Sequence, residues 1–123
     1  MKKSFIIFLL CISFPISAFS FTLDDIVGFW LSDEPEPMHS TKSILIITTN
    51  SIKQGKRSPI TCEFTQSDGN IIATFEGPLR HTVKYKINLK DDKLILYFPN
   101  AGGSYGKRIY SRVNEVEAKK YLQ

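Results

Sequence analysis

The sequence predicts an all-β fold, a small antiparallel barrel or sandwich of seven or eight short strands. After residue 28, apolar and polar residues alternate with period two through most of the chain. Turn-forming sequences separate these segments at intervals of roughly 8 to 12 residues, and no crossover helix lies between them. The composition, with 42% hydrophobic and 23% charged residues, is that of a globular protein and excludes a disordered or fibrous chain.

The first 20 residues have the parts of a secretory signal peptide. Lys2 and Lys3 form a basic start, residues 5–12 form an apolar run, and small residues precede the expected cleavage point after Ser20. We therefore predict a periplasmic or secreted protein with a single domain over 21–123. A membrane span needs about 20 apolar residues. Serines and a proline lie on either side of this run and keep it short, so we expect no membrane span.

The domain is predicted to begin with a helical turn and a short strand. Thr22 and Asp25 have the spacing of a capping box, and Gly28 ends the helix after about one turn. Residues 29–31 then form a strand. The acidic stretch 33–37 ends it, because its two prolines cannot continue a strand ladder.

The middle of the chain predicts two pairs of strands. Residues 43–49 are a strongly apolar, β-branched run that predicts a buried strand, and 51–53 begins its return. The segments 60–65 and 71–76 alternate and flank Asp-Gly at 68–69. Because Asp-Gly favours the tight turns that join antiparallel strands, we expect a hairpin here.

The last third predicts three strands and a helix. Residues 82–89 alternate cleanly between the two faces of a sheet, and 94–98 follows after a polar turn. We expect a mobile loop over 99–106, where three glycines and a proline oppose a strand. The last strand is predicted over 107–113. A short C-terminal helix follows, with Asn114 as its cap.

Two segments carry a family resemblance. The opening Gly28-Phe29-Trp30 and the closing strand 108–112 resemble the lipocalin-like group of the calycin superfamily, whose members are up-and-down β-barrels. In that family the tryptophan of a Gly-x-Trp motif closes one barrel end, and a basic residue of the last strand packs over the indole. By position, Trp30 matches that tryptophan and Arg112 the basic residue, with Arg108 as the alternative.

The resemblance implies that a small, largely apolar molecule binds inside the barrel or in its mouth. An eight-stranded barrel is either filled by side chains or holds one small ligand. We expect Phe64, Phe75, Tyr85 and Phe98 to point inward and to form the ligand-binding residues, with Gly28, Trp30 and Arg112 in structural roles.

A second resemblance gives an alternative function. Periplasmic inhibitors of secreted metalloproteases include short barrels with a similar Gly-x-Trp segment, and they block the active site with an N-terminal tail. Residues 21–25 form such a tail only if the first turn is not docked against the barrel. The alternative is therefore a protein-binding module, an inhibitor or immunity-type partner of a secreted enzyme. Tyr105, between glycines, is a further contact candidate.

The sequence gives little support to enzymatic activity. No Gly-x-Ser-x-Gly, His-Glu-x-x-His or phosphate-binding loop occurs. His39 and His81 have no obvious partner. Asp33, Glu34, Glu36 and His39 could supply metal donors, but prolines hold this stretch extended, which favours a solvated acidic loop. We expect no catalytic residues, no metal site and no cofactor.

The charge and the cysteine content limit the classes of binding partner that we expect. Without the first 20 residues, 14 Lys plus Arg face 12 Asp plus Glu, a net charge of +2. The densest basic run, 53–57, lies in a predicted loop, so we expect no nucleic-acid binding. Cys62 is then the sole cysteine and alternates with Ile60 and Phe64. We predict a buried, inert thiol and a monomer, with an intermolecular disulfide as the alternative.

Overall fold

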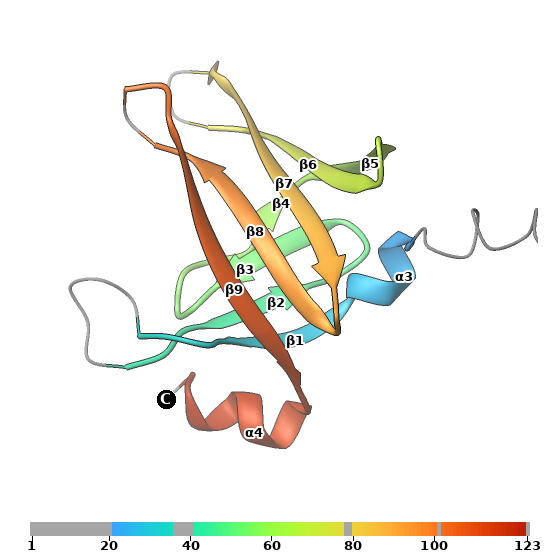
Figure 1. Cartoon of the computed structure of the whole chain (residues 1–123). Coiled ribbons are helices and arrows are strands. Elements are labelled where there is room, and N and C mark those ends of the chain that lie inside the picture. Colours follow the sequence, from blue (N-terminus) through green and yellow to red (C-terminus); the bar gives the residue numbers. More distant parts are fainter. Residues whose placement is uncertain (1–20, 36–40, 78–79, 101, 123) are drawn as a thin grey trace, which may run out of the picture.

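The chain folds as a nearly closed antiparallel β-barrel with two short helices (Figure 1). The computed structural model describes residues 21–35, 41–77, 80–100 and 102–122. The predicted signal peptide, 1–20, lies outside the described residues. So do Glu36 and His39 of the predicted acidic loop. Within the described ranges, no helix is long and apolar enough to cross a membrane.

The elements follow the chain in an up-and-down order. The first half comprises α3 (Leu23–Ile26), β1 (Gly28–Ser32), β2 (Ile44–Ile47), β3 (Ser51–Gln54), β4 (Ile60–Thr61) and β5 (Glu63–Ser67). The second half comprises β6 (Asn70–Glu76), β7 (Thr82–Lys90), β8 (Lys93–Pro99), β9 (Tyr105–Val113) and α4 (Glu115–Lys120). The expected all-β antiparallel class is confirmed, and the barrel is compatible with a lipocalin-like fold.

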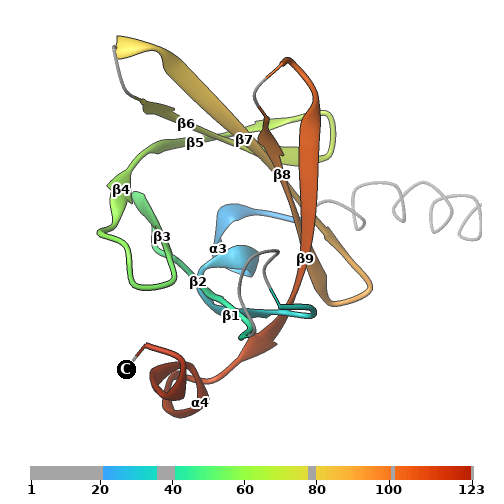
Figure 2. The same cartoon turned by 90° about the vertical axis from the view of Figure 1, so that its left-hand side faces the viewer.

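The ring closes through β1, which pairs with strands from both halves of the chain. On one side Trp30 pairs with Leu45 of β2, and on the other it pairs with Arg112 of β9. The sheet order is β4-β3-β2-β1-β9-β8-β7-β6-β5. Figure 2 shows the resulting ring of strands.

The predicted number of strands, seven or eight, is wrong, because the described residues form nine. The segment 60–65, predicted as one strand, is divided at Cys62. β4 before it pairs with β3, whereas β5 after it pairs with β6. The Cys62 N–H donates to the carbonyl of Asn50 at 3.0 Å, in the turn between β2 and β3. The sheet therefore has two edges, at β4 and β5, and the chain itself joins them.

The predicted hairpin at 68–69 is confirmed. Asp68 and Gly69 have φ angles of 50° and 79° between the paired residues Ser67 and Asn70. Two successive residues with positive φ make the turn whose twist matches that of antiparallel strands. The same geometry recurs between β7 and β8, where Asp91 and Asp92 both have positive φ.

The predicted loop 99–106 is shorter in the structure. Pro99 ends β8 and pairs with Tyr105, and Phe98 pairs with Gly106, so β9 begins two residues earlier than predicted. A Cβ atom on Gly106 would lie 2.5 Å from the ring of Phe98. This glycine therefore allows the ring to pack against the neighbouring strand and does not break the strand.

Apolar side chains form two cores. The larger one fills the barrel and contains Trp30, Leu94, Leu96 and Tyr110, each fully buried. The smaller one lies where α4 contacts β1, around Ala118. The predicted helix is confirmed, and the side chain of its cap Asn114 accepts a hydrogen bond from the Glu117 N–H at 2.8 Å.

Candidate functional site

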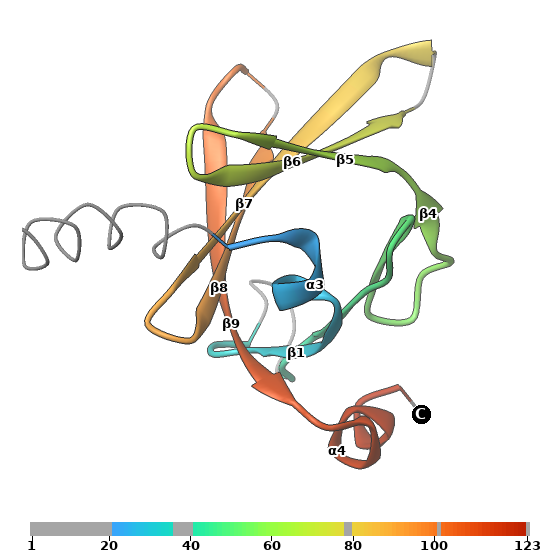
Figure 3. The ribbon, with the colours of Figure 1, turned by 90° about the vertical axis from the view of Figure 1, so that its right-hand side faces the viewer.

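The N-terminal helix α3 closes one end of the barrel. Figure 3 looks at this end, where α3 lies within the ring of strands. Ile26 of α3 is fully buried, and its carbonyl accepts a hydrogen bond from the indole Nε1 of Trp30 at 2.9 Å. The buried indole N–H of Trp30 therefore has its hydrogen-bond partner in α3 itself, and this bond joins the helix to β1.

Arg112, not Arg108, lies over Trp30 at this end. Its guanidinium carbon is 4.2 Å from the centre of the indole. Nη1 donates to the carbonyl of Val27 at 3.1 Å, and Nη2 donates to that of Asp25. Gly28 has a φ of 142°, and a Cβ atom there would lie 2.7 Å from Arg112 Nη1. Glycine therefore suits the positive φ, and its missing side chain leaves room for the guanidinium.

The end opposite α3 contains the candidate ligand site, a pocket of about 700 Å³. In an up-and-down barrel, successive turns alternate between the two ends. The pocket is lined by the chain entering β2 and by the turn after β3, which both lie at the end away from α3. Figure 2 looks toward this end. The volume falls within the range of small-molecule sites, about 300 to 1,000 Å³.

Aromatic rings from β7 and β8 form the inner wall of the pocket. The rings of Tyr85 and Phe98 both line it, with centroids 6.5 Å apart. Tyr85 also contacts Phe75 edge to face, at 5.0 Å and 88°. Edge contacts of this kind hold rings in fixed orientations. The wall is therefore a preformed aromatic surface.

Arg108 points into the pocket from β9. It pairs with the fully buried Leu96 of β8, and it lies two residues before the fully buried Tyr110, on the same face of the strand. Its guanidinium carbon is 5.3 Å from the centre of the Phe98 ring. The strand alternation that places Tyr110 in the core thus places a positive charge on the pocket wall.

Arg57 brings a second guanidinium near the same wall. It is an exposed residue of the segment between β3 and β4, across the ring from β7. Burial raises the pKa of the Tyr85 hydroxyl, and the positive charges of Arg57 and Arg108 act in the opposite direction. Both arginines therefore lie close enough for their fields to reach this hydroxyl, which stays neutral and can donate a hydrogen bond at neutral pH.

The pocket has a marked excess of positive charge. Its described lining residues include four cationic side chains and no aspartate or glutamate: Lys42, Lys56, Arg57 and Arg108. A second hollow of about 620 Å³ shares Phe98 and Arg108 with it and is lined by Asp33 and Glu34. Arg108 and Phe98 therefore separate a basic compartment from one that contains carboxylates.

The four aromatic residues predicted to face the interior all pack against the barrel core and are half-buried. Tyr85 and Phe98 line the candidate pocket, whereas Phe64 and Phe75 do not. Sequence reasoning missed Arg57 and Arg108 as pocket residues. The position of Arg108 could have been predicted, because it lies two residues before the apolar Tyr110 in a strand and therefore on the same face. Arg57 reaches the pocket because the strands close into a ring, and the local sequence around Arg57 does not predict this closure.

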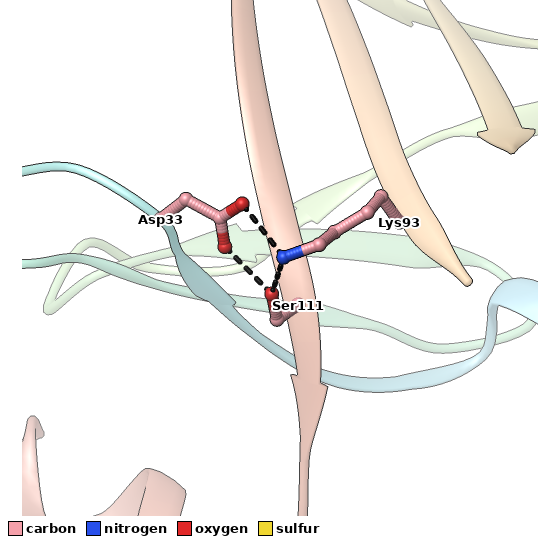
Figure 4. Close-up of polar contacts among 3 residues, drawn as sticks. All are labelled: Asp33, Lys93 and Ser111. Atoms are coloured by element: carbon pink, nitrogen blue, oxygen red, sulfur yellow. Dashed lines mark hydrogen bonds and ion pairs between the residues drawn. The ribbon is translucent and has the colours of Figure 1, made fainter. Parts of the chain in front are cut away.

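Asp33, Lys93 and Ser111 form a polar cluster on the barrel wall, which sequence reasoning also missed (Figure 4). Lys93 Nζ donates to Asp33 Oδ2 at 2.9 Å and to Ser111 Oγ at 2.6 Å, and Ser111 Oγ donates to Asp33 Oδ1 at 2.6 Å. Both hydrogen bonds lower the pKa of Asp33, and the bond from Ser111 has the larger effect. Lys93 thus donates to both other members of the cluster, and the Ser111 hydroxyl accepts from Lys93 while it donates to Asp33.

The cluster ties three separate parts of the sheet together. Asp33 follows β1, Lys93 begins β8 and Ser111 lies in β9. Of the four candidate donors in the predicted acidic loop, Asp33 belongs to this cluster, whereas Glu36 and His39 lie outside the described residues. No group of three or more His, Cys, Asp or Glu side chains among the described residues could hold a metal ion.

The predicted inhibitory tail is docked on the barrel. Phe21 and Leu23 pack against the core, and the Gln66 side chain of β5 donates to the Phe21 carbonyl. The condition under which 21–25 could reach into an enzyme active site is therefore not met in this structure.

Comparisons with family models, curated proteins and solved structures found no match for this chain.

Proposed function

We propose that the protein is an exported, lipocalin-like binding protein that holds a small, largely apolar molecule in the open end of its barrel. The observation that carries this proposal is the pocket of about 700 Å³ beside the aromatic rings of Tyr85 and Phe98. A pocket of this size, formed at a barrel mouth and walled by fixed rings, is typical of small-molecule sites.

Fluorescence with a neutral apolar dye, N-phenyl-1-naphthylamine, tests the proposal. We expect emission to rise on binding to the purified protein, and the Phe98→Ala variant to bind more weakly. Tyr97→Ala is the matched control, because Tyr97 is the next residue of β8, on the opposite face, with its ring 4.7 Å from Lys86 Nζ. Equal dye binding by all three proteins, or no binding by any, would contradict the proposal.

Export is tested by the mass of the protein recovered from the periplasm or medium. Cleavage after Ser20 leaves a chain that begins at Phe21, and we expect that mass. Recovery of the full-length chain in the cytoplasm would contradict the assignment of a signal peptide.

A protein-binding function is the second candidate, and one observation favours it. Tyr105 is 64% exposed at the start of β9, beside a hollow of about 400 Å³. The other residues that line this hollow are Ile72, Lys84, Tyr85, Lys86 and Tyr97. Native mass spectrometry of the exported protein separates the two candidates. A bound small molecule supports the first, whereas a protein adduct lost in Tyr105→Ala supports the second.

A further inference from the structure

We propose that the ligand of the open-end pocket carries an anionic oxygen group on its apolar body, and that Arg57 and Arg108 bind this group beside the hydroxyl of Tyr85. The inference rests on the proposed function and adds the chemical class of the ligand. Suitable groups are a carboxylate, a sulfonate or a phosphate.

The first argument is the position of the arginines. Arg108 extends inward from β9, and Arg57 comes from the segment between β3 and β4, on another side of the ring. Both line the pocket together with Tyr85 of β7. Two guanidinium groups and a neutral hydroxyl thus approach one region from three separate parts of the barrel. Guanidinium groups match the planar, bidentate geometry of oxyanions, which makes this set suited to one anionic group.

The second argument is the charge of the pocket. The described lining carries four cations and no carboxylate, whereas the whole chain has 16 basic and 12 acidic residues. A cleft lined by one sign of charge raises the local concentration of the opposite ion. The charge of the described lining therefore favours an anion over a neutral ligand.

The third argument is the apolar part of the lining. Tyr85, Phe98 and Tyr121 line the same pocket as the cations, and each is partly exposed. Burial of an apolar body against these side chains adds about 25 cal/mol per Å². An inorganic anion would leave this surface in contact with water. The pocket therefore fits an amphipathic anion better than free phosphate or sulfate.

Displacement of N-phenyl-1-naphthylamine by three ligands with the same chain tests the inference: decanoate, decan-1-ol and decyltrimethylammonium, each below its aggregation concentration. We expect decanoate to displace the dye from the purified protein at a concentration about tenfold lower than decan-1-ol, because charge-assisted bonds to arginine are about twice as strong as neutral ones. The cation should be the weakest competitor. The preference for decanoate should decrease as the salt concentration rises.

Variants of the two arginines identify the residues responsible. Arg57→Gln and Arg108→Gln should each remove most of the preference for decanoate, measured as the ratio of the concentrations of decanoate and decan-1-ol that displace half of the dye. Arg57 is exposed in a loop, so its variant should fold normally. Lys86→Gln is the control, because Lys86 lies over Tyr97 on the outer face of the barrel and does not line this pocket. It removes one positive charge elsewhere and should retain the preference.

The possible outcomes separate this inference from the proposed function. If decanoate and decan-1-ol displace the dye equally, the inference is wrong and the proposed function stands. If inorganic phosphate competes as well as decanoate, the ligand is a free oxyanion and the amphipathic class is wrong. If the dye itself does not bind, the proposed function fails. A preference for decanoate that persists in both arginine variants would also overturn the assignment.

Discussion

The two ends of the barrel contain the same pair of side chains, an arginine of β9 over an aromatic ring, in different surroundings. At the closed end Arg112 lies 4.2 Å over Trp30 and donates to carbonyls beside α3. At the open end Arg108 lies 5.3 Å over Phe98 and borders a pocket of about 700 Å³. The difference between the two ends is the helix α3, which covers the pair at the closed end, whereas the pair at the open end borders an uncovered pocket.

The largest expected effect is at the closed end. Trp30→Ala removes a fully buried indole and its hydrogen bond to Ile26, and we expect it to lower the free energy of unfolding by about 3 to 5 kcal/mol. Chemical denaturation measures the change. An unaltered midpoint would show that the indole does not hold the closed end together.

The two arginines give the direct comparison. Arg112→Gln loses hydrogen bonds to two carbonyls near α3, and we expect a loss of about 1 to 2 kcal/mol in stability, because charge-assisted bonds contribute about 1.5 to 3 kcal/mol and this side chain is exposed. Arg108→Gln should cost less stability and act on anion binding instead. Denaturation and dye displacement on both variants measure this. If Arg108→Gln were the more destabilising, the contrast between the two ends would be wrong.

The Asp33 cluster predicts a pH dependence of stability. Hydrogen bonds from Ser111 and Lys93 hold the pKa of Asp33 below its ordinary value of 3.8. The stabilisation is therefore fully present above pH 3.8 and is lost as the pH falls through the lower pKa of the folded state. Because the side chains of Asp33 and Lys93 are 33% and 46% exposed, we expect their ion pair to contribute at most about 1 kcal/mol to the free energy of unfolding.

Asp33→Asn measures this contribution. Its stability should lie below that of the wild type at pH 7, and the difference should shrink as the pH is lowered below 3.8. Urea denaturation at several pH values gives both curves. A difference that grew on acidification would contradict the assigned role of the carboxylate.

The smallest expected effect concerns Cys62, which lies at the junction of β4 and β5. Its side chain is 6% exposed, and burial raises the pKa of the thiol to about 11. The thiolate is the reactive form, so we expect slow labelling by a thiol reagent in the folded protein and fast labelling after unfolding. The protein should also elute as a monomer under oxidising conditions. A dimer abolished by Cys62→Ser would contradict the buried thiol.

Most of the fold could be predicted from the sequence, because its signals are local. Period-two alternation located the strands, and Asp68-Gly69 fixed a hairpin. The division of segment 60–65 at Cys62 could not be predicted, because the Cys62 N–H donates to Asn50, which lies in the distant turn between β2 and β3. The contacts of Asp33 could not be predicted either, because they join residues 60 and 78 positions apart.

The candidate site was only partly predictable. Alternation identified Tyr85 and Phe98 as inward-facing, but the charge of the pocket comes from residues that meet only when the ring closes. Lys42 and Lys56 lie in sequence contexts that indicate solvated loops. Their convergence depends on the sheet order, which brings the β2 entry and the β3 turn across from β7.

The junction at Cys62 also affects how the barrel can deform. Everywhere else around the ring, neighbouring strands are joined by ladders of backbone hydrogen bonds, and separating them breaks those bonds. Between β4 and β5 the described residues form no such ladder, and the chain joins the two strands through Cys62. Opening the wall at this junction breaks no β-ladder and at most the hydrogen bond from Cys62 to Asn50, so a change in barrel width costs fewer backbone hydrogen bonds here than between paired strands.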